Sequence, residues 1–331
     1  MSQLVTGAPA ERRAPGRFQL GWDVALRLGL LSIVIILAIV FTLTAPGFLS
    51  AQNLENNERQ MAVIGILAIG ETFVIITAGI DLSVGSMLGF SGILAALALG
   101  HGMPIPLAIV GVLVIATLLG LFSGVLIDTA SLPPFIVTLG MLGILRGFTQ
   151  IFGNGQQIAF GNSPFTDFAA NNFLGIPQLF WVLVVIALVA AYLLHCTRRG
   201  RHVFAIGSNL EGARRAGINV RAMTFLVYGV SALLAGIAGV LLTARQAQGD
   251  PNAGTGYELD AIAAAVLGGA SLFGARGSIL GTFLGVLLVQ ILTNGLNLLN
   301  FDPQVARIAE GALLILFVYI DHWRKRRLAT A

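Results

Sequence analysis

The stretch GIDLSVGSMLG, residues Gly79–Gly89, separates two long apolar runs of the sequence. It contains one aspartate, two serines and three glycines, which predict a break between two membrane helices. Asp81 precedes the point where the second run begins, so we expect its carboxylate to cap the new helix by accepting backbone N–H groups. The alternative is that Asp81 lines a pathway or gate, because charged groups within a membrane usually face a cavity or a partner.

The composition predicts an integral membrane protein. Of the 331 residues, 56% are hydrophobic and 10% are charged, whereas soluble domains carry about 25% charged residues. The single cysteine, Cys196, excludes an internal disulfide and a cysteine metal cluster, and the four histidines lack metal-ligand spacing. We therefore expect no metal site. The basic residues lie mainly in loops and tails on one side of the membrane, which explains the positive net charge without a nucleic-acid partner.

Apolar stretches of about 20 residues cross a bilayer as helices. The sequence has ten candidate spans: residues 24–45, 61–79, 84–100, 104–127, 133–152, 179–196, 222–243, 259–272, 278–299 and 304–320. Arginines precede the first span, fill the loop after the sixth and follow the tenth, which marks these segments as cytoplasmic. We therefore expect an all-α polytopic membrane protein with both termini in the cytoplasm. It would comprise a cytoplasmic N-terminal arm (1–23), a transmembrane domain (24–321) and a basic cytoplasmic tail (322–331).

The break at Gly79–Gly89 has an echo later in the chain. Residues 269–281, GASLFGARGSILG, repeat its order of glycine, aspartate or serine, leucine and glycine with two extra residues. Glycine-interrupted segments at matching positions of duplicated halves are typical of transporters. The echo indicates a possible internal duplication, although glycine-rich membrane helices also resemble one another by chance.

Eight residues in or beside the spans are candidates for a translocation pathway or gate. They are Glu71, Asp81, Ser83, Phe135, Thr138, Arg146, Asp260 and Asn294. A charge at the bilayer centre costs about 3 kcal/mol or more, so each charged member either faces a cavity or is paired. For Glu71 and Arg146 the sequence does not decide between these roles.

The sequence offers no candidate catalytic residues. It lacks a phosphate-binding loop, a nucleophile elbow and a zinc-protease motif, and its only lysine, Lys325, lies in the tail. A membrane enzyme is therefore disfavoured. A secondary transporter driven by an ion gradient remains an alternative, since Glu71 and Asp81 could serve as paired intramembrane carboxylates.

The loop at 197–221 is basic and contains a predicted short helix. Asn209 is expected to cap a helix over 210–216, and Gly217 to end it. Such a helix in a cytoplasmic loop could dock a partner. The alternative is an ordinary positive-inside loop.

Four motifs carry a resemblance to a known family. They are ETFVIITAGIDLSVGSMLG (71–89), PPFIVTLGMLGILRG (133–147), GRHVFAIGSNLEGARRAGINV (200–220) and GTGYELDAIAAAVLGGASLFGARGSILGTFLG (254–285). In this order they resemble the permease subunits of bacterial ATP-binding-cassette (ABC) importers for monosaccharides, of the ribose, xylose, arabinose and galactose type. The resemblance covers the chain from about residue 60 to residue 320, and residues 1–23 carry no match.

The resemblance implies a non-catalytic permease in the bacterial inner membrane, working by alternating access. Its implied partners are a second permease copy, a cytoplasmic ATPase that uses ATP and Mg²⁺, a periplasmic sugar-binding protein and membrane lipid. The related permeases for branched-chain amino acids or nucleosides are an alternative with the same architecture. The implied ATPase-coupling residues are Gly207, Asn209, Glu211, Ala213, Arg214, Arg215, Gly217 and Ile218. Gly212 departs from the family's usual alanine, which should weaken the short helix by about 1 kcal/mol.

Overall fold

The computed structural model describes residues 17–161 and 163–329. These residues form thirteen α-helices and four strands of two residues each, which confirms the expected all-α membrane fold. The predicted N-terminal arm, 1–23, lies mostly outside the described residues, as do the last two residues of the predicted tail, 322–331. The division into arm, transmembrane domain and tail stays a prediction.

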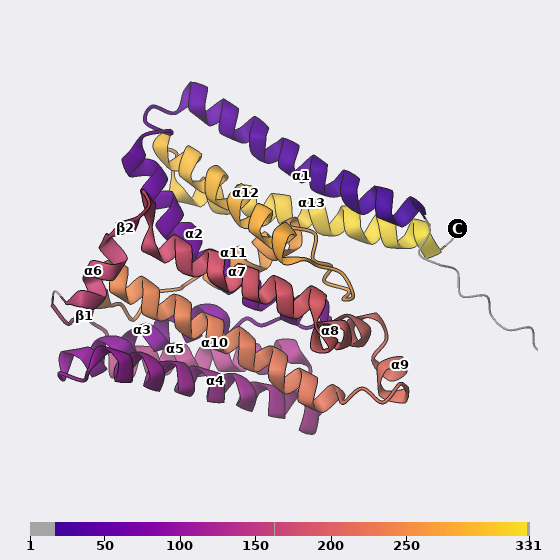
Figure 1. Ribbon diagram of the computed structural model, residues 1–331, viewed down its shortest axis with the longest axis horizontal. Coiled ribbons are helices and arrows are strands. Elements are labelled where there is room, and N and C mark those ends of the chain that lie inside the picture. The colour runs from indigo at the N-terminus through magenta and orange to yellow at the C-terminus, as the bar shows by residue number, and fades with distance from the viewer. Residues whose placement is uncertain (1–16, 162, 330–331) are drawn as a thin grey trace, which may run out of the picture.

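Ten helices form the bundle, and the longest of them run roughly along the long axis of the molecule (Figure 1). The ten helices are α1 (Arg17–Thr44), α2 (Ala51–Ile76), α3 (Val84–Gly100), α4 (Ile105–Thr129), α5 (Pro134–Phe152), α7 (Gln178–Cys196), α10 (Val220–Gln246), α11 (Tyr257–Leu267), α12 (Ile279–Leu298) and α13 (Pro303–Ala329). Seven of them are long and apolar enough to cross a membrane, namely α2, α4, α5, α7, α10, α12 and the part of α13 up to His322. Two shorter apolar helices, Leu28–Thr44 of α1 and the whole of α3, correspond to the first and third predicted spans.

The remaining elements lie at the two ends of the bundle. One end carries α6 (Pro164–Ala170) and the antiparallel strand pairs β1 (Ile158–Ala159) with β4 (Gln248–Gly249) and β2 (Asn172–Phe173) with β3 (Ile176–Pro177). The opposite end carries α8 (Arg198–Ser208) and α9 (Leu210–Arg215). The beginning of α1 and the end of α13 also lie at this second end, in agreement with two termini on one side of the membrane (Figure 1).

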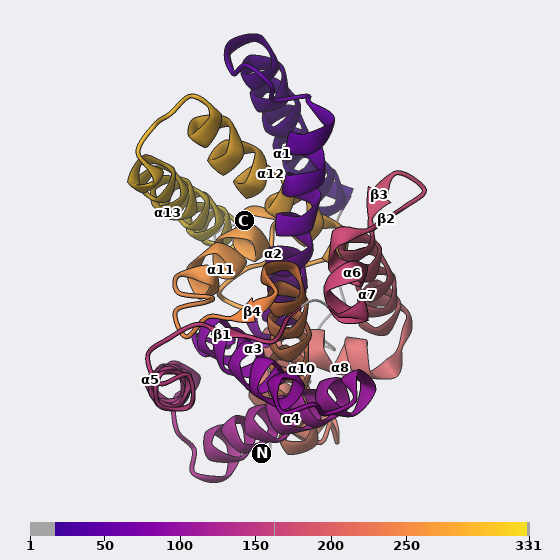
Figure 2. The same cartoon turned by 90° about the vertical axis from the view of Figure 1, so that its left-hand side faces the viewer.

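The centre of the bundle is formed by α2 and α10. Helix α10 packs against α4, α3 and α2, and α2 also packs against α11, α12 and α7. Small residues bring the two central helices close together, since a Cβ atom added at Gly70 would lie 3.2 Å from the Cα of Ser231. Viewed along the bundle, α1, α12 and α13 lie on one side of this centre and α4 and α5 on the other (Figure 2).

The eighth predicted span, 259–272, is wrong in its extent. In the structure, α11 has only 11 residues and is about 16 Å long, against a hydrocarbon core of about 30 Å. It ends at Leu267 because Gly268 and Gly269 follow, and Gly269 adopts a φ of +93°.

The segment 248–256 precedes this half-length helix and runs back into the bundle along α3. A Cβ added at Gly249 would lie 2.8 Å from the Cβ of Ala96, and one at Gly89 would lie 2.7 Å from the carbonyl oxygen of Ala253. One at Gly254 would overlap the carbonyl oxygen of Gly85. Gly85 and Gly89 of GIDLSVGSMLG therefore accommodate an irregular backbone segment inside the bundle.

Candidate functional site

The break between α2 and α3, residues 77–83, is built around the carboxylate of Asp81. One carboxylate oxygen accepts the backbone N–H of Ser83 at 3.0 Å and its hydroxyl at 2.6 Å. The other accepts the hydroxyl of Ser231 on α10 at 2.9 Å. These three donors offset the cost of burying Asp81, which is only 2% exposed. As expected, the Asp81 carboxylate accepts a backbone N–H group at the start of α3. The N-cap position itself is occupied by Ser83, which Asp81 holds in place.

Two further helices bind the same break. Glu71 on α2 accepts the backbone N–H of Asp81 at 3.1 Å, and Thr138 on α5 donates its hydroxyl to the carbonyl of Ile80 at 3.1 Å. The structure thus brings together Glu71, Asp81, Ser83 and Thr138 from the predicted pathway set. Sequence reasoning missed Ser231, because a single serine in a helix rich in alanine and glycine gives no signal of its partner. All five side chains are buried, so this cluster fixes the break, and a gating role for it stays a prediction.

Arg146 on α5 binds the segment that re-enters the bundle. Its Nη1 donates to the carbonyl oxygens of Pro251 at 3.1 Å and Ala253 at 2.8 Å. Irregular backbone at membrane depth needs partners for its polar groups, because no water is available in the hydrocarbon region. The geometry therefore gives Arg146 a structural role in satisfying these carbonyls.

The other predicted pathway residues lie apart from this cluster. Asn294 on α12 forms two reciprocal amide hydrogen bonds with Asn53 on α2, at 2.8 and 3.0 Å. Asp260 on α11 faces Glu310 on α13. Phe135 lies on the open face of α5 and is 51% exposed. The eight candidates therefore do not form one continuous lining within a single chain.

The predicted short helix of the cytoplasmic loop is present as α9. Asn209 caps it by accepting the N–H of Gly212 at 2.8 Å, and Gly217 follows the helix with a φ of +79°. Ala213 is buried against the rest of the protein. The opposite face is exposed and carries Glu211, Arg214 and Arg215.

A second helix in this loop, α8, was not anticipated from the sequence. Thr197 caps it by accepting the N–H of Gly200 at 3.1 Å, and Val203 and Ile206 are buried on one face. The alternation of arginines with these apolar residues at helical spacing was the signal that could have revealed it. The last turn of α8 contains Gly207, which faces the interior of the protein and not the solvent: a Cβ added there would overlap the carbonyl oxygen of Ile76.

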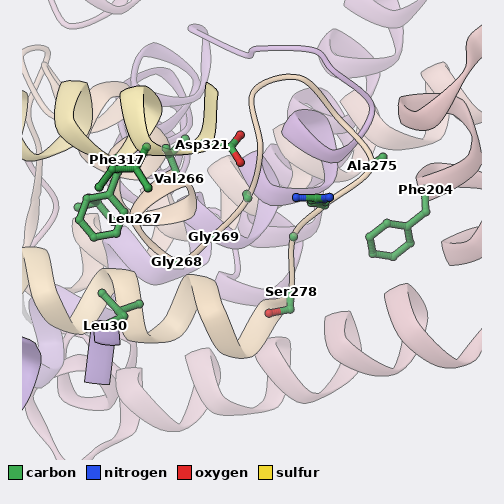
Figure 3. Close-up of a pocket in the computed structure, with 14 residues that line it drawn as sticks. Leu30, Phe204, Val266, Leu267, Gly268, Gly269, Ala275, Ser278, Phe317 and Asp321 are labelled. Atoms are coloured by element: carbon green, nitrogen blue, oxygen red, sulfur yellow. The ribbon is translucent and has the colours of Figure 1, made fainter. Parts of the chain in front are cut away.

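A cavity of about 270 Å³ lies beside the segment 268–278, between α1, α8 and α13 (Figure 3). Leu30, Phe204 and Phe317 form apolar parts of its wall, and Asp321 a polar part. The Asp321 carboxylate accepts the hydroxyl of Ser271 at 2.6 Å, which ties the segment to α13. Within the described parts of the chain, no group of three or more histidine, cysteine, aspartate or glutamate side chains could hold a metal ion.

Comparison with known proteins places this architecture in a family. A family model described as branched-chain amino acid transport system / permease component matches residues 53–318. The ribose import permease protein of Escherichia coli (strain K12) is 40% identical over 297 residues, which cover 88% of this chain and 92% of that protein. The xylose transport system permease protein of Haemophilus influenzae (strain Rd) is 34% identical over 361 residues, covering 90% of this chain and 96% of that protein.

A third relative, the D-allose transport system permease protein of Escherichia coli (strain K12), is 34% identical over 313 residues, covering 94% of this chain and 95% of that protein. No solved structure matches the chain. The relatives are permease subunits, so the expectations of a non-catalytic chain and of a multi-pass inner-membrane protein are confirmed. The chain belongs to this family and is a permease subunit of an ABC importer.

Proposed function

We propose that the chain carries a monosaccharide across the bacterial inner membrane. The observation that carries this proposal is the similarity over nearly the whole chain to permeases named for ribose, xylose and D-allose. The family description names branched-chain amino acids, but these three relatives are all named for sugars. We therefore favour a sugar over an amino acid or a nucleoside.

The family implies an ATPase and a solute-binding protein as partners. We assign ATP and Mg²⁺ to the ATPase and no cofactor to this chain, whose only lysine is Lys325. We further propose that α9 docks on the ATPase. Its exposed face carries Arg214 and Arg215 at the end that the helix dipole makes negative, while its buried face anchors it to the bundle.

We also propose that two copies of the chain form the pathway between them. Supporting this, α5 stands at the side of the bundle and packs mainly against α3 and α4 (Figure 2). A Cβ atom added at Gly140, Gly143 or Gly147 on this helix would meet no other atom within 4 Å. A helix face with open glycines lets a second helix, or a solute, approach closely. Lipid would cover the remaining apolar faces, and no nucleic acid is involved.

In the proposed cycle, ATP binding closes the ATPase dimer and moves the docked α9 helices. The bundles then rock and expose the sugar to one side of the membrane at a time. Because the binding protein selects the solute, the pathway needs few fixed hydrogen bonds to the sugar. Phe135 and the open glycines of α5 fit such a lining better than the buried Glu71–Asp81 cluster does.

Charge reversal on α9 tests the docking proposal. Arg214→Glu should lower ATP-driven sugar uptake at least tenfold in proteoliposomes containing both partners, while the permease remains inserted. Gly217→Pro should act similarly, because proline cannot adopt the φ of +79° found there. Arg199→Glu reverses an exposed arginine on α8 and is the matched control, with little change expected. Unchanged uptake in both α9 variants would refute the docking of α9.

The identity of the solute is tested with the binding proteins themselves. A panel of purified sugar-binding and amino-acid-binding proteins, each loaded with its own radiolabelled ligand, is presented to the reconstituted complex. Uptake and stimulated ATP hydrolysis with a monosaccharide-binding protein support the proposal. Stimulation only by an amino-acid-binding or nucleoside-binding protein would replace the sugar assignment and leave the ABC assignment intact.

A further inference from the structure

The last turn of α8 touches both interruptions of the membrane helices. A Cβ added at Gly207 would overlap the carbonyl oxygen of Ile76, at the end of α2, and would lie 2.7 Å from the backbone nitrogen of Ala275. The carbonyl oxygen of Gly207 would in turn lie 2.6 Å from a Cβ added at Gly274. Backbone therefore meets backbone here, without flexible side chains that could absorb a displacement.

The two interruptions also contact each other. The N–H of Ala275 donates to the carbonyl of Ile76 at 2.9 Å, and a Cβ at Gly274 would lie 3.1 Å from the Cβ of Ala78. Near this junction, the hydroxyls of Thr72 on α2 and Thr282 on α12 lie 2.6 Å apart. The segments 77–83 and 268–278, which echo each other in sequence, thus form one connected body in contact with α8.

Space for movement lies beside this body. The cavity of about 270 Å³ borders the segment 268–278 and separates part of it from Leu30 of α1 and Phe317 of α13 (Figure 3). The contact at Gly207 is closely packed, whereas the cavity leaves space towards α1 and α13. A push transmitted at Gly207 can therefore displace the segment without compressing a packed core.

We propose that Gly207 is the positioning residue through which α8 and α9 drive the two interruptions, and that the two interruptions move as a single unit. This inference rests on the proposed function. It gives Gly207 a role inside the permease, in contrast to the ATPase contact that the family resemblance implies for it. The small size of Gly207 is required because any side chain would separate α8 from the end of α2.

The first test replaces Gly207 by alanine and measures coupling. Gly207→Ala is expected to retain binding of the ATPase and ATP hydrolysis but to lower sugar uptake at least tenfold, so that more ATP is hydrolysed per sugar imported. Gly100→Ala makes the same change at the exposed end of α3, where an added Cβ would meet nothing within 4 Å, and should leave this ratio unchanged. A Gly207→Ala variant that transports normally would overturn the proposal, as would one that loses only ATPase binding.

The second test acts on the folded protein and does not depend on how Gly207→Ala folds. Thr72→Cys and Thr282→Cys, which flank the two interruptions, are combined in a Cys196→Ser background. The two hydroxyl oxygens lie 2.6 Å apart, so the sulfur atoms that replace them would face each other near the S–S bond length of about 2.05 Å. Oxidation should form the bond and leave uptake within about twofold of the reduced protein, since the two segments move together.

Two results of the second test would overturn the proposal. Uptake that stops on oxidation and returns with a reductant would show that the interruptions move apart, and failure of the disulfide to form would show that they are not in contact. The protein with Cys196→Ser alone is the reference for both. If that reference shows no ATP-driven sugar uptake, the proposed function fails; if it does and only the variants behave otherwise, this inference alone fails.

Discussion

The two interruptions, 77–83 after α2 and 268–278 after α11, are each tied to a neighbouring helix by a hydrogen bond between a hydroxyl and a carboxylate. They differ in which of the two groups belongs to the interruption. In the first, the carboxylate belongs to the break, since Asp81 accepts donors from Ser83 and from Ser231 on α10. In the second, the break supplies the donor, and Ser271 reaches out to Asp321 on α13. The sequence echo aligns Asp81 with Ser271, so matching positions exchange the roles of acceptor and donor.

Their surroundings differ as well. The first interruption is bound by α2, α5 and α10 at once, whereas the second borders a cavity of about 270 Å³. Similar glycine-rich interruptions are therefore tied to the surrounding helices to different degrees. The first is held by hydrogen bonds from three helices, and the second borders open space on one side.

The largest effect is expected for Asp81→Ala, which removes the hydrogen-bond acceptor at the centre of the first interruption. Three donor interactions lose their partner in a buried site, and each unsatisfied group costs about 1–3 kcal/mol. We expect the yield of inserted, monodisperse protein to fall several-fold and its melting temperature in detergent to drop. Size-exclusion chromatography and a thermal unfolding assay measure both quantities.

Asp81→Asn and Ser231→Ala are the matched controls for this prediction. Each removes only part of the network, so each should destabilise the protein less than Asp81→Ala does. An Asp81→Ala protein that assembles normally and changes its sugar preference would instead assign Asp81 to the pathway.

A smaller effect is expected for Ser271→Ala in the second interruption. The variant removes one hydroxyl from Asp321 and should cost about 1 kcal/mol, with insertion unchanged in the same thermal unfolding assay. If Ser271→Ala destabilises the protein as much as Asp81→Ala, hydrogen bonds stabilise the two interruptions equally and the contrast between them is wrong.

The link between the interruptions gives a third prediction. Thr72→Val and Thr282→Val each remove a hydroxyl from the buried pair that is 2.6 Å apart. Because the two residues are in contact, the double variant should be more stable than the sum of the single effects by about 0.5–1 kcal/mol. If the two single effects on the free energy of unfolding add exactly in a double-mutant cycle, this contact does not couple α2 to α12.

The smallest effect is expected for Gly212→Ala on α9, outside both interruptions. Alanine should favour the helix by about 1 kcal/mol over glycine, but α9 is exposed and already capped by Asn209. Circular dichroism of the permease and ATP-driven uptake should therefore change little. A large gain in uptake would show that the stability of α9 limits coupling.

Local signals in the sequence predicted part of this structure well. The cap at Asn209, the end at Gly217 and the break at Asp81 follow from residue types that act on their own backbone. The re-entrant segment 248–256 was missed, because its sequence QGDPNAGTG is polar and turn-forming and predicts an ordinary loop outside the membrane. The partner of Asp81 on α10 was missed as well, since a contact across 150 positions leaves no local pattern.

The role of Arg146 shows the same limit. Its position within a span indicated a buried charge, but its acceptors are backbone carbonyls, which are present in every residue and carry no sequence signature. The direction in which Gly207 faces depends on how α8 packs against α2, and neither the helix nor its packing was anticipated.

The most direct test of the account is the energy source of transport. The permease is reconstituted in proteoliposomes with its ATPase, the sugar-loaded binding protein is supplied on the opposite face, and uptake of radiolabelled sugar is measured. The account predicts uptake that requires both ATP and the ATPase subunit and does not respond to proton or sodium gradients. Uptake driven by either gradient, by the permease alone and without ATP, would contradict it.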